Sequence, residues 1–261
     1  MKQTTLSFER SIFLDSSSPE EIKKWNATGV IDGVTTNQMI MLRDKVTAAS
    51  YEKIIKAICR EMKEKPVSVE LTDSKVSVKK MVAEAKNLDK LATNIVVKVP
   101  LIPDTTKSLE VIKKLTDLNI AVNVTTMMTF EQMILAILAV RHNKRVSFVS
   151  LFWGRSIEDH KRYRSKKTFE KQYPKFGAES EIDADVFKQV RECANFLNEG
   201  GYKNPKIIVG SIRSASQVGL VFAAGGHIST VPPPVLEAML FSKRSIETIN
   251  DFDKAWKELK S

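Results

Sequence analysis

Short apolar segments alternate with longer amphipathic segments along almost the whole chain, and this alternation limits the possible folds more than any other feature. Eight segments have the length and β-branched composition of strands: residues 11–16, 33–37, 66–71, 94–100, 120–126, 145–152, 206–211 and 227–232. Each is followed by apolar positions at helical spacing, as in SYEKIIKAICREMKE at 50–64. Eight strand–helix units are the number that closes a (β/α)8 barrel, also called a TIM barrel. The alternative is an open doubly wound α/β sheet, which usually has fewer strands.

The chain is expected to form one α/β domain over residues 1–261, because no Ser/Gly-rich linker divides it. Neither of the phosphate-loop motifs GxGxxG and GxxxxGKS/T occurs in it, which weakens the open-sheet alternative. The regular alternation is interrupted once, after the sixth strand, by residues 156–182. We interpret this stretch as an insertion over the active-site face. Residues 249–260, INDFDKAWKELK, predict an extra C-terminal helix.

Composition favours an ordinary soluble protein without a metal or cofactor. The chain is 43% hydrophobic and 28% charged, and no apolar run reaches transmembrane length, so we expect no membrane partner. Its two cysteines lie far apart and its three histidines are scattered. We therefore expect a cytoplasmic location, no disulfide framework and no metal site.

The net charge of +10 could serve either nucleic acid or phosphorylated metabolites. The densest basic run, residues 160–175, is more typical of a solvated surface or a local lid, and no nucleic-acid motif stands beside it. We expect no nucleic-acid partner, and binding of an anionic macromolecule by this run is a secondary hypothesis.

Lys98 stands inside the apolar segment NIVVKVP at 94–100. Burying an ammonium group is costly unless it is paired or loses its proton. A lysine in an apolar barrel has a depressed pKa, so its neutral amine can attack a carbonyl and form a Schiff base. The structural alternative is an ion pair with an inward carboxylate such as that of Glu70.

Polar residues occur at the end of one predicted strand after another. In a (β/α)8 barrel the active site lies at the carboxyl ends of the strands. The residues there are Asp15, Thr35, Thr36, Asn37, Glu70, Lys98, Asn123, Thr125, Ser150, Arg155, Ser211 and Arg213. Taken singly, an Asn or Asp at a strand end often caps the next helix, and an arginine can form a surface ion pair. Their convergence on one mouth favours an active site instead.

The residue types suggest the chemistry. Asp15 suits the base that removes a hydroxyl proton when a carbon–carbon bond is cleaved. Amides and hydroxyls suit a hydroxyl-rich carbon chain, and the two arginines suit a phosphate group, which they bind through paired N–H donors. Together these residues indicate a metal-free aldolase-type enzyme that acts on phosphorylated sugars.

The motifs FLDSS, GVTTN, VVKVP, NVT, SLFWGR and GSIR resemble those of the transaldolase family, which includes small transaldolase-like proteins and fructose-6-phosphate aldolases. The match follows the strands in order across residues 11–235. The resemblance implies class I aldolase chemistry in carbohydrate metabolism. A lysine captures a ketose phosphate, releases an aldose phosphate, and passes the remaining dihydroxyacetone unit to a second aldose phosphate. It also implies a homo-oligomer.

Roles for single residues are implied by the same resemblance. Lys98 matches the Schiff-base lysine, and Asp15 matches the acid/base at the cleaved bond. Glu70 and Thr125 match the pair that holds a water for proton transfer. The substrate-binding candidates are Thr35, Asn37, Asn123, Ser150 and Phe152, and the phosphate-binding candidates are Arg155, Ser211 and Arg213.

Within the family, Glu70 and Phe152 favour transaldolases, because the aldolase branch prefers glutamine and tyrosine at these positions. Asn123 points the same way. Gln38 and Leu151 replace prolines that are common in the family, and Gln38 is expected to add a polar side chain near Asn37. The alternatives are a fructose-6-phosphate aldolase, a specialised dihydroxyacetone transferase of a biosynthetic pathway, and a non-catalytic sugar-phosphate-binding protein.

Overall fold

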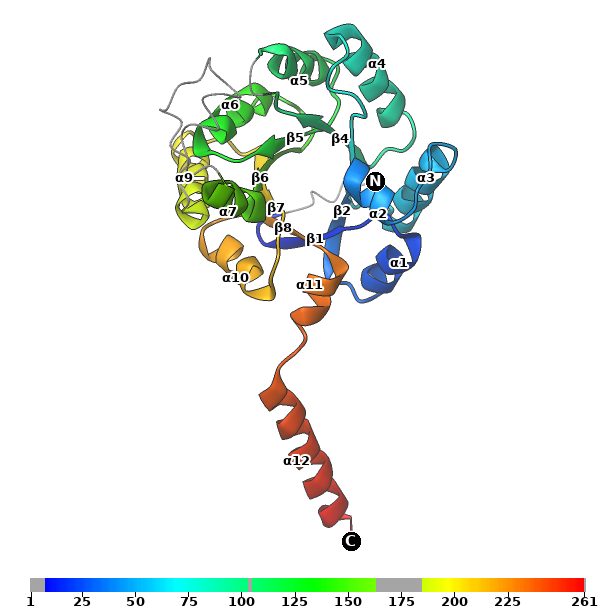
Figure 1. The fold of residues 1–261 in the computed structure, drawn as a ribbon, viewed down its shortest axis with the longest axis vertical. Coiled ribbons are helices and arrows are strands. Elements are labelled where there is room, and N and C mark those ends of the chain that lie inside the picture. Colours follow the sequence, from blue (N-terminus) through cyan, green and yellow to red (C-terminus); the bar gives the residue numbers. More distant parts are fainter. Residues whose placement is uncertain (1–7, 103–104, 163–184, 261) are drawn as a thin grey trace.

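Eight parallel strands close into a barrel in the order of the chain, with β8 pairing back onto β1 (Figure 1). The structure is a computed structural model and describes residues 8–102, 105–162 and 185–260. The predicted (β/α)8 barrel is confirmed. Its strands are β1 Ser11–Asp15, β2 Ile31–Thr35, β3 Val67–Glu70, β4 Ile95–Pro100, β5 Val122–Met127, β6 Ser147–Phe152, β7 Pro205–Gly210 and β8 Ile228–Val231.

Helices follow the strands and surround the barrel, apart from the last, which projects from it (Figure 1). They are α1 Pro19–Ala27, α2 Gln38–Arg43, α3 Tyr51–Met62, α4 Val78–Asp89, α5 Lys107–Asp117, α6 Phe130–Val140, α7 Trp153–Arg162, α9 Val186–Glu199, α10 Ala215–Ala223, α11 Pro233–Ala238 and α12 Lys243–Leu259. Of the insertion predicted at 156–182, the first residues belong to α7, and residues 163–182 lie outside the described part of the chain. Its place over the active-site face therefore stays a prediction.

The second strand is the main correction to the sequence prediction. It was expected at 33–37 but runs from Ile31 to Thr35, because Ile31 is buried and pairs with Ile12 of β1. Asn37 instead begins the short helix α2, which the sequence did not predict. Its side chain accepts a hydrogen bond from the Ile40 N–H at 2.9 Å. The other strands shift by at most about two residues at their ends, as is usual for boundaries read from sequence.

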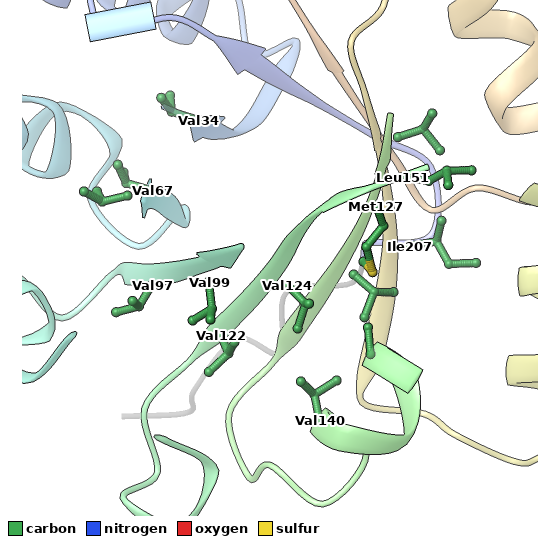
Figure 2. Packing of buried hydrophobic residues seen from close by; sticks show 14 of the residues in the cluster. Val34, Val67, Val97, Val99, Val122, Val124, Met127, Val140, Leu151 and Ile207 are labelled. Carbon is green, nitrogen blue, oxygen red and sulfur yellow. The ribbon is translucent and has the colours of Figure 1, made fainter. Parts of the chain in front are cut away.

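Alternation along each strand separates an outer core from the barrel interior. In β4, Val97 and Val99 belong to the large core between barrel and helices, whereas Val96 belongs to a small inner cluster. Figure 2 shows the valines of neighbouring strands contributing to the outer core. Because side chains alternate between the two faces of a strand, Lys98 projects into the barrel like Val96. This register explains how a charged residue fits in an otherwise apolar strand.

An aromatic cluster fills the amino-terminal half of the barrel interior. Phe8, Phe13 and Phe148 contact each other edge to face, with ring centroids 5.6–5.8 Å apart. Gly33 makes room for them, since a Cβ atom at this position would lie 2.6 Å from the Phe13 ring. The polar residues at the carboxyl ends of the strands thus stand above an apolar floor.

The last helix, α12, extends away from the barrel (Figure 1). It has no buried residue, and it carries the exposed side chains Ile246, Ile249, Phe252, Trp256 and Leu259. None of the helices in the described ranges is both long and apolar enough to cross a membrane.

Candidate active site

A cavity of about 390 Å³ opens at the carboxyl ends of the strands, where the polar residues converge. Of the site residues predicted from the sequence, all but Thr36 and Glu70 line it. These residues are Asp15, Thr35, Asn37, Lys98, Asn123, Thr125, Ser150, Phe152, Arg155, Ser211 and Arg213. They come from strands on all sides of the barrel and from the segments that follow them.

Lys98 lies at the base of this cavity and is only 4% exposed. Its Nζ donates a hydrogen bond to the Thr36 carbonyl oxygen at 2.9 Å and forms an ion pair with Glu70 Oε2 at 3.1 Å. The pair is set by the strand register, in which Glu70 of β3 lies directly opposite Lys98 of β4. Glu70 therefore belongs to the site through Lys98 although it does not line the cavity. Thr36 contributes its backbone, a role that its side-chain type does not indicate.

Asp15, at the end of β1, accepts a hydrogen bond from the Thr35 hydroxyl at 2.8 Å on its Oδ1 atom. Burial raises the pKa of Asp15 above its usual value. The charge of Lys98, the hydrogen bond from Thr35, and the charges of Arg43 and Arg155 act in the opposite direction. No hydrogen bond to Asp15 Oδ2 comes from any described residue, so this oxygen is available to a ligand hydroxyl.

Asn123 is held from both sides. Its Oδ1 accepts a hydrogen bond from the Ser150 hydroxyl at 2.7 Å, and its Nδ2 donates to Ser68 Oγ at 3.1 Å. This arrangement fixes the amide orientation and leaves one N–H on Nδ2 for a ligand. The nearby Thr125 hydroxyl is fully buried and has no hydrogen-bond partner within the described part of the chain. Buried polar atoms are nearly always paired, so this hydroxyl calls for a partner from a ligand or from solvent.

Asn37 lies both at a helix start and at the cavity, so its capping role does not exclude the predicted binding role. Its Oδ1 caps α2 while its side chain lines the cavity, and the amide nitrogen is left to face a ligand. Gln38, the next residue, does not line the cavity. Its Nε2 donates to the Leu71 carbonyl oxygen at 2.7 Å, so Gln38 fastens the start of α2 to the end of β3. The Gln38 side chain, which was expected to add a polar group near Asn37, thus contacts the backbone after β3 and not the cavity.

The two predicted phosphate-binding arginines lie on neighbouring segments. Because α7 begins directly after β6, Arg155 projects from the first helical turn, with its Cζ 5.0 Å from the centroid of the Phe152 ring. Arg213 follows β7 and forms an ion pair with Glu158 at 3.3 Å. The Gly154 N–H donates to the Ser211 carbonyl oxygen at 3.0 Å, which joins the two segments. Ser211 adopts a left-handed φ of 59° at this junction.

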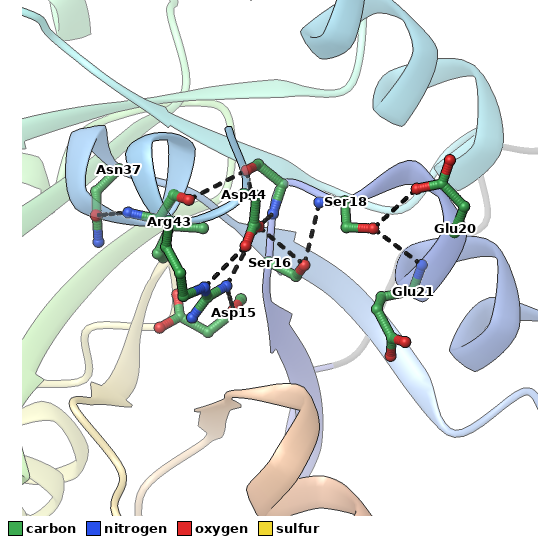
Figure 3. A network of polar contacts seen from close by, with 10 residues as sticks. Asp15, Ser16, Ser18, Glu20, Glu21, Asn37, Arg43 and Asp44 are labelled. Atoms are coloured by element: carbon green, nitrogen blue, oxygen red, sulfur yellow. Dashed lines mark hydrogen bonds and ion pairs between the residues drawn. The ribbon is translucent and has the colours of Figure 1, made fainter. Parts of the chain in front are cut away.

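Arg43, Thr230 and Met39 also line the cavity, and sequence reasoning missed all three. Figure 3 shows Arg43 held by Asp44, with Nε to Oδ1 at 2.8 Å, while its Nη2 donates to the Asp15 carbonyl oxygen at 3.3 Å. The Asp44 carboxylate also accepts hydrogen bonds from Ser17, both from its backbone N–H at 2.8 Å and from its hydroxyl at 2.9 Å. Asp44 therefore ties α2 to the segment after β1. Of these three residues, only Arg43 had a signal in the sequence, because it is a basic residue six positions after the predicted substrate-binding Asn37.

Among the described residues, no group of three or more His, Cys, Asp or Glu side chains could hold a metal ion. Cys59 and Cys193 are both free and buried, and burial raises the pKa of each thiol to about 12. Neither cysteine lines the cavity.

A family model described as transaldolase/fructose-6-phosphate aldolase matches residues 12–261, which is nearly the whole chain. The chain belongs to the transaldolase/fructose-6-phosphate aldolase family. A protein named probable transaldolase from Streptococcus equi subsp. equi is 31% identical over 248 residues, which cover 95% of this chain and 98% of the relative. A probable transaldolase from Streptococcus agalactiae serotype V is 29% identical over the same lengths.

Solved structures with the same fold are more distant from this family member in sequence. A dihydrodipicolinate synthase variant described as monomeric has a TM-score of 0.58 at 12% identity, covering 97% of this chain and 80% of that chain. The dihydrodipicolinate synthase of Rhodopseudomonas palustris has a TM-score of 0.55 at 11% identity, covering 87% and 71%. These similarities show the barrel fold alone.

Proposed function

We propose that this transaldolase-like protein transfers a dihydroxyacetone unit from a ketose phosphate to an aldose phosphate through a Schiff base on Lys98. The observation that carries the proposal is the position of Lys98. Its amine lies inside the barrel at the base of a polar cavity and forms an ion pair with Glu70 at 3.1 Å. Asp15 lines the same cavity. A nucleophile, a partner for its proton and a separate base are the groups that Schiff-base aldol chemistry requires.

In the first half of the reaction, the Lys98 amine adds to the ketone carbon of the donor, and loss of water gives an iminium. Asp15 then takes the proton of the hydroxyl group at the bond to be cleaved. The electrons of that carbon–carbon bond move into the iminium, which releases an aldose phosphate and leaves an enamine on Lys98. Asp15 Oδ2 suits the proton transfer because Oδ1 is already engaged by Thr35.

In the second half, the enamine carbon attacks the aldehyde carbon of an acceptor aldose phosphate, and Asp15 returns its proton to the new hydroxyl. Water then adds to the iminium and frees the product from Lys98. These steps need a proton carrier near the nitrogen, and Glu70 and the orphaned Thr125 hydroxyl support that role for a water between them.

We match the substrate groups to cavity residues by the hydrogen-bond donors and acceptors that these residues leave free. The free amide N–H groups of Asn37 and Asn123 and the oxygen of Ser150 suit the hydroxyl groups of the three-carbon unit. Arg155 and Arg213 suit the phosphate at the far end, with Ser211 between them in sequence. Phe152 supplies an apolar wall beside Arg155.

Acceptor dependence separates transfer from simple aldol cleavage. With fructose 6-phosphate as donor, we expect glyceraldehyde 3-phosphate to form rapidly only when erythrose 4-phosphate is present. Equal rates without the acceptor, with free dihydroxyacetone as product, would instead establish a fructose-6-phosphate aldolase. A donor and acceptor panel read by product mass would show whether the enzyme is a specialised dihydroxyacetone transferase. No turnover with any ketose phosphate, while such ligands still stabilise both wild type and Lys98→Ala, would indicate a non-catalytic binding protein.

A further inference from the structure

Three side-chain oxygens form a hydrogen-bonded chain across the strands that flank Asp15. Thr35 of β2 donates to Asp15 Oδ1 at 2.8 Å, and the hydroxyl groups of Thr35 and Thr230 are hydrogen-bonded to each other. Thr230 comes from β8, on the other side of β1, and both threonines are buried. Thr230 lines the cavity but has no role in the reaction steps given above.

The direction of this chain follows from counting protons. A threonine hydroxyl has one proton, and the proton of Thr35 is used on the Asp15 carboxylate. Thr35 therefore accepts in its contact with Thr230, so the Thr230 hydroxyl is the donor. The order of donation is Thr230 to Thr35 to Asp15. In such a chain each hydrogen bond polarises and strengthens the next.

The packing around Thr230 supports a fixed hydroxyl. A Cβ atom placed on Gly210 would lie 3.2 Å from the Thr230 methyl carbon, so the bare glycine provides the space in which this methyl group sits. Threonine has few side-chain rotamers, and fixing the methyl group also fixes the direction of the hydroxyl. Among the described residues, Thr35 is the only hydrogen-bond donor to the Asp15 carboxylate, so its orientation matters for Asp15.

We propose that Thr230 is a positioning residue for Asp15, which it orients by donating a hydrogen bond to Thr35. The inference rests on the proposed function only in the role given to Asp15. With Oδ1 held by Thr35, Oδ2 is presented to the substrate hydroxyl. Thr230 does not touch the reacting atoms in this arrangement and acts through Thr35.

Several charged groups around Asp15 also influence its pKa, and a Thr230 variant leaves them in place. Lys98 from β4, Arg43 from α2 and Arg155 from α7 act on the Asp15 carboxylate, and Glu70 and Arg213 are further charged groups around the site. All of these remain in a Thr230 variant. The Thr35 hydrogen bond lowers the pKa of Asp15 against the effect of burial, so weakening that bond should raise this pKa further.

The test compares Thr230→Val, which has nearly the same shape but no hydroxyl, with Thr230→Ser, which keeps the hydroxyl. We expect kcat of Thr230→Val to fall roughly threefold to tenfold with little change in KM, as for the loss of one neutral hydrogen bond. Asp15 must be ionised to act as a base, so the acidic limb of kcat/KM should move to higher pH in Thr230→Val. Thr230→Ser should restore both values. A fall in kcat without a shifted limb would show a merely structural role and overturn the inference.

A second readout is independent of turnover. Infrared difference spectra between pH values report the carboxyl band of Asp15, which is identified by its loss in Asp15→Asn. We expect this band to titrate at higher pH in Thr230→Val than in wild type and in Thr230→Ser. A shifted band in a protein without transferase activity would refute the proposed function but support the positioning role. An unshifted band in an active enzyme would refute the positioning role alone.

Discussion

Lys98 and Glu70 form a mostly buried ion pair, which places the Glu70 carboxylate, a group that can accept and return a proton, directly beside the proposed nucleophile. The Lys98 nitrogen can attack a carbonyl only after it loses a proton, and the Glu70 carboxylate lies within reach of that proton at 3.1 Å. Glu70→Gln keeps the shape but cannot accept the proton. Because the aldolase branch prefers glutamine at this position, the loss should concern transfer: we expect kcat for transfer to an acceptor aldose phosphate to fall about 10²–10⁴-fold, the range typical of general acid–base groups. Steady-state kinetics of the variant measure this effect.

The matched control for this prediction is Glu52→Gln. Glu52 forms an exposed ion pair with Lys56 on α3, at 2.5 Å, and exposed pairs contribute little to stability. This control should leave kcat unchanged. A Glu70→Gln enzyme with wild-type kcat would remove Glu70 from the proton-transfer steps.

The sequence indicates candidate residues for this site most directly where the proposed chemistry resides in an unusual side chain. Lys98 is conspicuous because a cation in a β-branched run is physically costly. Thr230 and Ser68 could not be recognised in this way, since buried threonines and serines are ordinary strand residues. Their importance depends on hydrogen bonds to Thr35 and Asn123, which only the closed barrel brings within reach. The backbone role of Thr36 is likewise independent of its side chain.

At the scale of elements, the junction between α7 and the end of β7 holds the two predicted phosphate-binding arginines together. A Cβ atom on Gly154 would lie 2.4 Å from the Ser211 carbonyl oxygen and 2.8 Å from Arg213 Nε. Gly154→Ala should therefore push α7 away from Arg213. Since overpacking costs about 1–3 kcal/mol, we expect KM for a ketose phosphate to rise by roughly tenfold or more, with a smaller effect on kcat.

Gly219→Ala is the control for the same type of substitution. Gly219 lies within α10, and a Cβ atom there meets nothing within 4 Å. This variant should gain about 0.5–1 kcal/mol of stability with unchanged KM, because alanine is the better helix former. An unchanged KM in Gly154→Ala as well would show that the junction does not hold the phosphate.

Prediction of the elements failed where a helix is too short to repeat its apolar pattern. The six residues of α2 span less than two turns, so no apolar repeat could reveal them. Asn37 ends one predicted strand in the sequence but begins this helix in the structure, which moved the second strand by two residues. By contrast, a serine followed by proline is typical of a helix start, and at the start of α1 the Ser18 side chain, which precedes Pro19, accepts a hydrogen bond from the Glu21 N–H.

For the whole molecule, the projecting helix α12 supports the expected homo-oligomer. Its apolar side chains, including Phe252 and Trp256, recur at helical spacing and are exposed in the single chain. Apolar faces of this kind mark interaction surfaces. We expect the wild-type chain to sediment as an oligomer and the double variant Phe252→Asp/Trp256→Asp to sediment as a smaller species with an intact barrel.

Lys254→Ala provides the control, because Lys254 lies on the opposite side of α12 at 100° per residue. It should leave the sedimentation of the protein unchanged. A wild-type chain that sediments as a monomer would contradict the expectation, as would an unchanged oligomer in the double variant. Circular dichroism checks that the barrel remains folded.

The overall architecture was the most predictable level, because eight strand–helix units and their apolar alternation are local properties of the sequence. The inward positions could also be inferred, since a strand that buries Val97 and Val99 on its outer face must direct Lys98 inward. The shape of the cavity could not be inferred, because it depends on which side chains meet across the closed barrel. The domain limits and the insertion near 156–182 stay predictions.

The central claim is that Lys98 forms the covalent intermediate, and reductive trapping tests it most directly. The protein is incubated with fructose 6-phosphate and sodium borohydride and then analysed by peptide mass spectrometry. We expect a reduced three-carbon adduct on the peptide that contains Lys98, and none in Lys98→Ala. An unmodified Lys98 in a folded protein, or an adduct on another lysine that persists in Lys98→Ala, would contradict the account.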